Sequence, residues 1–167
     1  MSLCDRSGDG EHMRKHEGFS LIELLVVVAI ILIIAALAIP NFMRAKLAAN
    51  ESSAVESIRN INTAEVEYQT TYNVGYGTLS ALGTNAPGSC TATSTNACLI
   101  DDSLTSGTKS GYNFTLTPGT PPASYKSIAL PIIPGQSGQR GFCSDQSQVI
   151  RYNWAGTCDP QADKALQ

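Results

Sequence analysis

The chain has 167 residues, of which 43% are hydrophobic, and a formal net charge of −3. This length suits one modest domain, and the acidic balance excludes the basic surface typical of nucleic-acid binding, so we infer no specific nucleic-acid partner. The hydrophobic residues are unevenly distributed: residues 19–39 are apolar except at Ser20 and Glu23, whereas the chain from Asn41 onward is polar. This pattern predicts one membrane anchor that carries a soluble domain.

The apolar run is long enough to cross a bilayer. Its 21 residues would form a helix of about 31 Å, which matches the roughly 30 Å thickness of a hydrocarbon core. A cleaved signal peptide has a shorter apolar core and a small-residue cleavage site, whereas "AALAIP" runs directly into Pro40. An uncleaved signal anchor explains the run better, but neither class explains Glu23 or the preceding Gly18.

Charge alone does not orient this anchor, because Arg14 and Lys15 precede the run and Arg44 and Lys46 follow it. Four of the five cysteines lie beyond the run, at Cys90, Cys98, Cys143 and Cys158. An even number of cysteines in a region with little core predicts disulfides, which form in oxidising compartments. We therefore expect the soluble domain to be extracytoplasmic.

The stretch "GFSLIELLVVVAIILIIAALAIP", preceded by "MRKHE", resembles the class III signal of type IV pilins and the related pseudopilins. The resemblance implies that a prepilin peptidase cuts between Gly18 and Phe19 on the cytoplasmic side, and that Phe19 is then N-methylated. It matches Glu23 to the family's acidic residue and Pro40 to its helix-bending proline. A leader that starts at Met13 would have the more typical length, which leaves the true start open between Met13 and Met1.

The resemblance also implies an α+β pilin fold, in which a long N-terminal helix packs on a small C-terminal antiparallel sheet. The expected segments are a prepilin leader at 1–18, a hydrophobic transmembrane and assembly helix at 19–40, an amphipathic half of the long helix at 41–74 and a globular head at 75–167. The implied partners are membrane lipid before assembly, the prepilin peptidase, the inner-membrane pilus assembly machinery and other copies of the chain in a helical filament. The subunit would begin in the bacterial inner membrane with a periplasmic head and end in an extracellular pilus.

Burial of the Glu23 carboxylate in an apolar environment costs free energy, and this cost could favour correct packing in a filament. Cleavage would leave a positively charged amine on Phe19, and an unpaired carboxylate in a low-dielectric filament core would be strongly disfavoured. An ammonium from a neighbouring subunit would offset this cost and set the axial register, so we interpret Glu23 as an assembly residue. The alternative is that its side chain extends to the membrane interface and contributes little.

Pro40 removes one helical hydrogen bond, so the membrane helix could end just before it. The following sequence nevertheless contains no glycine or further proline as far as Tyr72. Apolar residues there share one helical face, at Val55, Ile58, Ile61, Tyr68 and Tyr72, with acids and Arg59 at the other positions. We predict one long helix, bent or locally melted at Pro40, whose apolar face docks on a sheet.

A turn-rich connection at 73–89 precedes the three or four antiparallel strands that we predict in the head. Two segments alternate apolar residues on one face, with Tyr112, Phe114 and Leu116 in the first and Ile128, Leu130 and Ile132 in the second. The segment "RGFCSDQSQVIRYNW" suggests a hairpin, with Val149 and Ile150 in its returning strand.

Four head cysteines allow three connectivities. We favour Cys90–Cys98 and Cys143–Cys158, because each pair closes a local loop that contributes about 2–4 kcal/mol. A zinc site is the competing role, but no Cys-x-x-Cys spacing occurs and both histidines precede the predicted cut. We therefore expect no metal and no cofactor.

No histidine would remain after processing, so a nucleophile, a base and an orienting acid cannot be assembled, and we expect no enzyme. Five acids could in principle bind calcium, at Asp101, Asp102, Asp145, Asp159 and Asp163, but they show no calcium-loop pattern and are interpreted as solvated. Asn113 in "NFT" fits a glycosylation pattern, although Phe114 has the position of a core residue.

Two functions remain open from the sequence. The first is a structural subunit of a type IV pilus that serves adhesion, motility or DNA uptake, and the alternative is a type II secretion pseudopilin in a periplasmic fibre. A C-terminal disulfide loop favours the pilin, whereas bound calcium without disulfides would favour the major pseudopilin. A stand-alone membrane-anchored binding protein would leave the spacing of Gly18, Phe19 and Glu23 unexplained.

Overall fold

A computed structural model of the chain describes residues 18–84, 90–120, 123–154 and 157–166. The chain forms two compact units, Met1–Ile39 and Pro40–Gln167. The expected leader, apart from Gly18, lies outside the described residues. The first unit therefore consists, in its described part, of a short extended start and one helix.

That helix, α1 (Leu21–Tyr72), continues from the first unit into the second. It begins where the carbonyl of Ser20 accepts the N–H groups of Glu23 and Leu24, at 3.1 and 3.2 Å. Pro40 lies inside α1 as the first residue of the second unit, and the residues on both sides of it are helical. The prediction of one long helix is therefore confirmed, but local melting at Pro40, one of the two forms that we predicted there, is wrong. The proline ring removes one hydrogen bond without ending the helix.

The end of α1 is set by a backbone turn. Asn73 has a φ of 54° and donates its N–H to the carbonyl of Gln69 at 3.0 Å, which is a left-handed helix end of the kind that asparagine tolerates. The connection beyond it was predicted as turns only, but it contains α2 (Leu79–Leu82). A second short helix, α3 (Asp102–Thr105), precedes the sheet.

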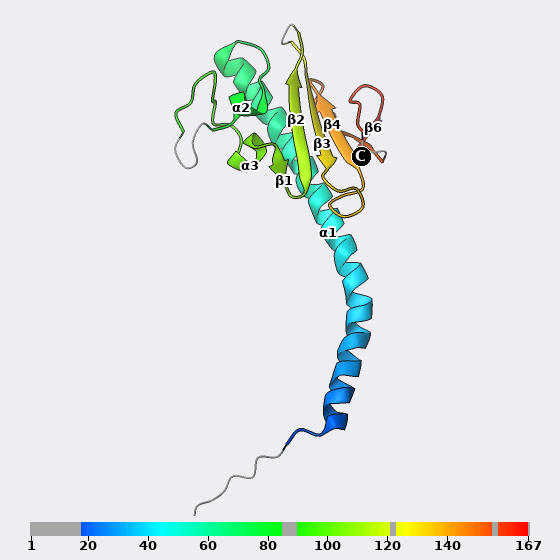
Figure 1. The fold of residues 1–167 in the computed structure, drawn as a ribbon. Coiled ribbons are helices and arrows are strands. Elements are labelled where there is room, and N and C mark those ends of the chain that lie inside the picture. The colour runs from blue at the N-terminus through cyan, green and yellow to red at the C-terminus, as the bar shows by residue number, and fades with distance from the viewer. Residues whose placement is uncertain (1–17, 85–89, 121–122, 155–156, 167) are drawn as a thin grey trace, which may run out of the picture. The chain divides into compact units, whose positions relative to one another are not determined.

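The head contains one antiparallel sheet whose strands follow each other in chain order (Figure 1). Its strands are β1 (Thr108–Lys109), β2 (Tyr112–Pro118), β3 (Tyr125–Pro131), β4 (Gly141–Asp145), β5 (Arg151–Asn153) and β6 (Lys164–Ala165). The expected α+β architecture, a long N-terminal helix with a C-terminal antiparallel sheet, is confirmed. The prediction of three or four strands missed the edge strands β1 and β6, which have two residues each and carry no periodic signal.

Residues of the second half of α1 form one core with the sheet (Figure 1). The predicted apolar face of the helix is confirmed, because Val55, Ile58, Ile61 and Tyr68 are buried and Tyr72 is partly buried. The alternation predicted for β2 is confirmed as well, since Tyr112, Phe114 and Leu116 are buried. Burial of these side chains stabilises the head by about 1.5–3 kcal/mol for each large apolar residue.

The predicted inward face of β3 is wrong. Tyr125, Ser127 and Ala129 are buried, whereas Ile132 is 46% exposed and the remaining two of the predicted residues, Ile128 and Leu130, are half-buried. The inward face is polar because it meets polar partners: the Tyr125 hydroxyl donates to Oδ1 of Asn62 on α1 at 3.0 Å. Apolar alternation could not reveal this, since Ile128 is itself covered on the outer face, opposite the disulfide-bonded Cys143.

The returning strand of the predicted hairpin begins later than expected. Val149 and Ile150 both precede β5, which starts at Arg151. Gln148 has a φ of 61°, so the turn after β4 extends further along the chain than the apolar pair suggested. Ile150 is buried nonetheless, and its carbonyl accepts the N–H of Leu166 at 2.7 Å.

Candidate functional site

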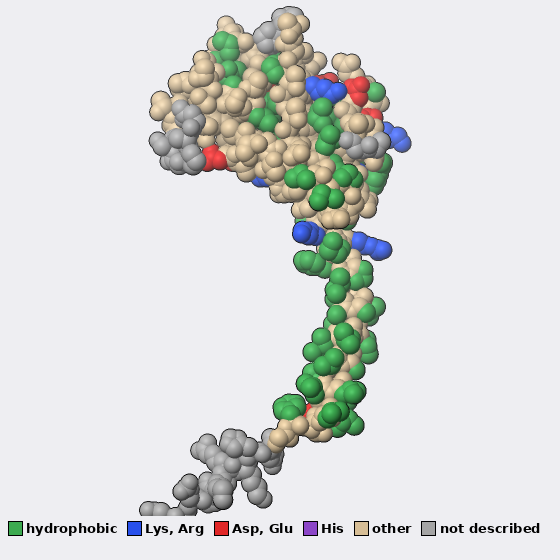
Figure 2. Space-filling view, in the orientation of Figure 1, with side chains coloured by type: hydrophobic (Ala, Val, Ile, Leu, Met, Phe, Trp, Pro, Cys, Tyr) green, Lys and Arg blue, Asp and Glu red, His purple; other side chains and the backbone are tan. Residues whose placement is uncertain are grey.

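The described part of the first unit exposes apolar side chains on every side of its helix. Figure 2 shows one side of this apolar surface. The exposed fraction of its large hydrophobic residues runs from 46% at Val28 to 80% at Leu21. By length and composition, α1 is the one helix in the described chain that could cross a membrane. A helix that is apolar all round is covered by lipid or by other protein, so this surface is a contact surface.

The predicted processing junction lies just before α1. A Cβ atom added to Gly18 would meet nothing within 4 Å, and the next side chain, that of Phe19, is 78% exposed. Packing within the described chain therefore does not require a glycine at this position. A requirement for Gly18 would have to come from another molecule that binds the junction.

Glu23 lies in the first turn of α1 and is exposed. Among the described residues it has no ion-pair partner. A carboxylate here interacts favourably with the positive end of the helix dipole, by about 0.3–1 kcal/mol. The spacing of Ser20 and Glu23 also fits a capping box, a local role that the sequence analysis missed although the pattern S-x-x-E was visible.

Both favoured cysteine pairs are present in the structure. Cys143 is bonded to Cys158 with a Cα–Cα distance of 5.7 Å, and Cys90 to Cys98 with a distance of 6.1 Å. The Cys143–Cys158 pair is buried and ties the C-terminal segment to β4. The carboxylate of Asp163 lies beside the sulfurs of Cys143 and Cys158. Because both sulfurs are bonded to each other in the disulfide, only the carboxylate remains as a ligand for a metal ion.

Peptide mapping without reductant should find Cys90 linked to Cys98 and Cys143 linked to Cys158. The expectation rests on the short Cα–Cα distances, which both lie in the range that a disulfide spans. Loss of the Cys143–Cys158 disulfide should destabilise the head by about 2–4 kcal/mol, because this disulfide closes the longer of the two loops. Free thiols or crossed pairs in the map would contradict the assignment.

A buried carboxyl lies between α1 and the connection that follows it. Glu65 has 0% of its surface exposed, and its Oε2 accepts the N–H of Gly77 at 2.9 Å, while Oε1 has no hydrogen-bond partner in the described chain. Burial raises the pKa of Glu65 from 4.5 to about 7, against the smaller lowering effect of the Gly77 bond. Sequence reasoning placed the acids of α1 outside the core, and for Glu65 this is wrong.

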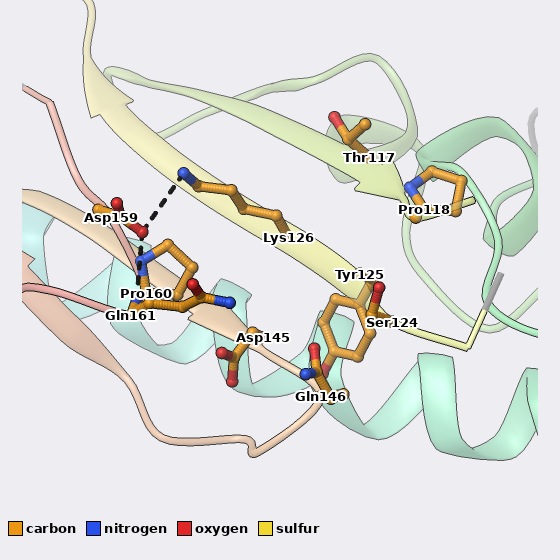
Figure 3. A pocket seen from close by; sticks show the side chains of 11 residues that line it. Thr117, Pro118, Ser124, Tyr125, Lys126, Asp145, Gln146, Asp159, Pro160 and Gln161 are labelled. Carbon is orange, nitrogen blue, oxygen red and sulfur yellow. Dashed lines mark hydrogen bonds and ion pairs between the residues drawn. The ribbon is translucent and has the colours of Figure 1, made fainter. Parts of the chain in front are cut away.

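A pocket of about 530 Å³ opens beside the ends of β2, β3 and β4 (Figure 3). Lys126 and Asp159 form an ion pair across it at 3.8 Å, and Asp145 accepts the N–H and the hydroxyl of Ser147. The described lining holds hydroxyl, amide and charged groups without a histidine or a cysteine thiol. It can bind polar groups, but it does not assemble a nucleophile with a base.

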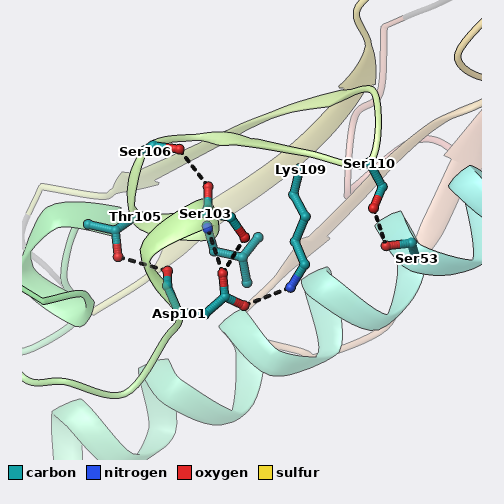
Figure 4. Close-up of polar contacts among 8 residues, drawn as sticks. Ser53, Asp101, Ser103, Thr105, Ser106, Lys109 and Ser110 are labelled. Carbon is teal, nitrogen blue, oxygen red and sulfur yellow. Dashed lines mark hydrogen bonds and ion pairs between the residues drawn. The ribbon is translucent and has the colours of Figure 1, made fainter. Parts of the chain in front are cut away.

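Asp101, one of the candidate calcium ligands, is used inside the fold (Figure 4). Its Oδ1 accepts the N–H of Leu104 at 3.0 Å and so caps α3, and its Oδ2 accepts Nζ of Lys109 at 2.6 Å. Burial works to raise the pKa of Asp101, but the hydrogen bonds from Lys109, Ser103 and Leu104 outweigh it and lower the pKa to about 2. Asp101 therefore caps α3, and its charge is paired with that of Lys109.

The exposed apolar helix follows a Gly-Phe junction, carries one acid in its first turn and continues into an α+β head. This arrangement agrees with the one expected for a prepilin-type protein. Residues 13–39 match the family described as the prokaryotic N-terminal methylation motif. The N-terminal part of the chain therefore carries this motif, and it is similar to the type IV pilins described next.

Two curated proteins are similar to the chain. Over 54 residues it is 43% identical to the type IV major pilin protein PilA of Myxococcus xanthus, a match that covers 32% of this chain and 24% of that protein. Over 74 residues it is 38% identical to the type IV wide pilus major component PilA4 of Thermus thermophilus, covering 42% of this chain and 56% of that protein. The chain thus spans less than two thirds of the length of these relatives, and no solved structure matches it.

Proposed function

We propose that the chain is a structural subunit of a type IV pilus filament that serves adhesion, motility or DNA uptake. The observation that carries the proposal is the part of α1 up to Ile39, which is apolar on all sides except at Glu23 in its first turn. Lipid can cover the apolar side chains, but its hydrocarbon core offers a carboxylate no partner. A bundle of identical helices offers one, because the processed amine of Phe19 from a neighbouring copy can pair with Glu23.

In this proposal membrane lipid holds α1 before assembly, with the head on the periplasmic side of the bacterial inner membrane. A prepilin peptidase removes residues 1–18, Phe19 is N-methylated, and inner-membrane machinery transfers the subunit into an extracellular pilus. The names of the relatives, a type IV major pilin and a wide pilus major component, support this course. Both disulfides suit an oxidising compartment.

The proposal includes no catalytic role. We propose a pilus rather than a type II secretion pseudopilus, because Cys143 and Cys158 close a C-terminal disulfide loop, the feature that favours a pilin. Asp101, which could have supplied a calcium ligand for the pseudopilin alternative, is instead engaged with Lys109 and α3. No observation in the described chain favours the pseudopilin.

Intact-mass measurement tests the processing step. Assembled fibres should contain a subunit that begins at Phe19 and carries one additional methyl group, while a Gly18→Val variant should remain as uncleaved precursor in the membrane. Since a Cβ at Gly18 meets nothing within 4 Å, this variant should fold normally, and its failure would report recognition by the peptidase. Fibres whose subunits still contain residues 1–18 would contradict the proposal.

A further inference from the structure

The apolar surface of α1 continues past Ile39 into the second unit. Phe42 and Met43 follow Pro40 on the helix and are 68% and 42% exposed. As one helix, residues 19–43 would measure about 37 Å, which exceeds the roughly 30 Å of a hydrocarbon core. A helix that is longer than the core tilts in the bilayer, so the residues directly after Met43 would lie among the lipid headgroups.

Two cations occupy this position. Arg44 and Lys46 are exposed, and neither side chain has a hydrogen-bond or ion-pair partner in the described chain. They differ in this from four other cations that each form an ion pair with an acid, namely Arg59, Lys109, Lys126 and Arg140. We refer to the four residues Phe42, Met43, Arg44 and Lys46 as the collar.

The positive charge of the collar is not compensated along the helix. The sequence has no acid between Glu23 and Glu51. Glu51 is engaged elsewhere, because its Oε2 lies 2.7 Å from Nη2 of Arg140. Arg44 and Lys46 are two residues apart, which is about 200° around a helix axis, so they point to different sides of α1. Figure 2 shows basic side chains on both sides of the helix beside the apolar ones.

A ligand that fits the collar has a negative group joined to an apolar part. A guanidinium and an ammonium both bind phosphate oxygens, and an anionic phospholipid offers a phosphate whose charge is not offset by a cation of its own. Its acyl chains would cover Phe42 and Met43 at the same time. A free phosphate or a nucleic acid would pair with the cations but leave these two apolar side chains in water. Basic residues directly beside an apolar helix are the feature by which proteins attract an anionic leaflet.

We propose that the collar binds anionic phospholipid headgroups on the extracytoplasmic surface of the membrane, with Arg44 and Lys46 pairing with the phosphates of two different lipids. The inference rests on the membrane-held stage of the proposed function and names the lipid class that holds the subunit there. These contacts break when the subunit enters a fibre, so they oppose its release from the membrane.

Lipid selectivity at the collar can be measured with one tryptophan. Trp154 is the only tryptophan of the chain, so Trp154→Phe removes the native emission, and Phe42→Trp in the same chain places an indole beside the cations. Both side chains are largely exposed, so these changes leave the core intact. The full chain would be reconstituted in phosphatidylcholine vesicles that contain equal fractions of either brominated phosphatidylglycerol or brominated phosphatidylcholine, whose bromine atoms quench a nearby indole.

At low salt, brominated phosphatidylglycerol should quench the indole more strongly, which corresponds to at least about threefold tighter binding than that of phosphatidylcholine. The preference should disappear at about 1 M salt, where the screening length is about 3 Å. Equal quenching by both lipids at low salt would overturn the proposal. So would a preference that inorganic phosphate removes at an ionic strength where sodium chloride does not, since the cations would then hold free phosphate. A preference seen only at a high ratio of protein to lipid would also overturn it, because the collar would then be a contact between copies.

Variants show whether the two cations are responsible. Arg44→Gln and Lys46→Gln should each remove part of the preference, and the double variant should remove all of it. Arg59→Gln is the matched control, because Arg59 is an exposed cation on the same helix that already pairs with Glu56 at 3.3 Å. Circular dichroism would establish that each variant is folded. A double variant with the selectivity of its parent chain would overturn the proposal.

The assay separates this inference from the proposed function. It uses purified chain in vesicles and requires neither cleavage after Gly18 nor fibre assembly. Equal quenching by the two lipids would therefore leave the pilus proposal intact, and an absence of fibres in cells would leave a measured lipid preference unchanged. Quenching by neither lipid would show that the helix does not enter the bilayer, which contradicts both the lipid contact and the membrane-held stage.

Discussion

Glu23→Ala should leave the amount of processed subunit unchanged and should yield few or no fibres. Removal of the charge would ease membrane insertion, by up to about 2–3 kcal/mol at full membrane depth. Folding of the head should not change, because Glu23 belongs to the first compact unit and the core is built by residues of the second. Assembly is the step that should fail, since the amine of Phe19 would enter a low-dielectric helix bundle without its partner.

Two further variants separate the charge of Glu23 from its local role in the helix. Glutamine at the same position keeps the capping-box pattern with Ser20 but removes the charge. Glu23→Gln should therefore be as deficient in fibres as Glu23→Ala if the carboxylate pairs with an amine. Glu23→Asp, which keeps the charge but has a shorter reach, should be intermediate.

The assay measures the membrane-held pool and the sheared fibres separately in cells that express each variant. Processing at Phe19 is checked by mass in every sample, so that a cleavage defect is not mistaken for an assembly defect. Normal fibre yield from Glu23→Gln together with loss in Glu23→Ala would mean that the residue only caps α1. Normal yield from both would mean that the carboxylate contributes nothing to assembly.

The long helix could be predicted well from the sequence because two different patterns extend over many residues. The apolar run marks its first half, and the spacing of Val55, Ile58, Ile61 and Tyr68 marks its buried face. Glu65 fills the gap of seven between the last two of these and therefore lies on the same face. Its acidic side chain concealed this, since a carboxyl at a buried position is uncommon.

The sheet was less predictable because both of its faces are partly covered. Alternation indicates the buried face of a strand only where the other face is in water. In β3 the inward side chains, such as Tyr125 and Ser127, are selected by hydrogen bonds to groups far away in the sequence. The contact between Arg140 and Trp154 had no signal in the sequence, because these two residues meet only through the pairing of β4 with β5.

Head stability should fall as pH rises from about 5 to about 8, and Glu65 should be the main cause. Its pKa is raised by burial from 4.5 in the unfolded chain to about 7 in the folded head. The folded head thus binds a proton more tightly than the unfolded chain does. The corresponding stability is fully present below pH 4.5 and is lost as pH rises through about 7, because a buried carboxylate then carries an unpaired charge.

The size of the effect follows from the difference in pKa. Each unit corresponds to about 1.4 kcal/mol, so the free energy of unfolding should decrease by about 3 kcal/mol across this range. The groups around Glu65 offer no compensation, because Tyr68 and Tyr125, on which it acts electrostatically, are raised in pKa and stay neutral here. The N–H of Gly77 is the only hydrogen-bond donor that the carboxyl has in the described chain.

Glu65→Gln should abolish this pH dependence, because the amide oxygen can still accept the bond from Gly77 but cannot become charged. The free energy of unfolding would be measured by denaturant titration of the full chain in micelles at pH 5 and pH 8. At pH 8 the variant should be more stable than wild type by up to about 3 kcal/mol, and at pH 5 the two should differ little. Glu67→Gln, an exposed acid on the same helix, should behave like wild type. A slope that persists in Glu65→Gln, or a wild type that gains stability with rising pH, would show that the buried carboxyl does not control the head.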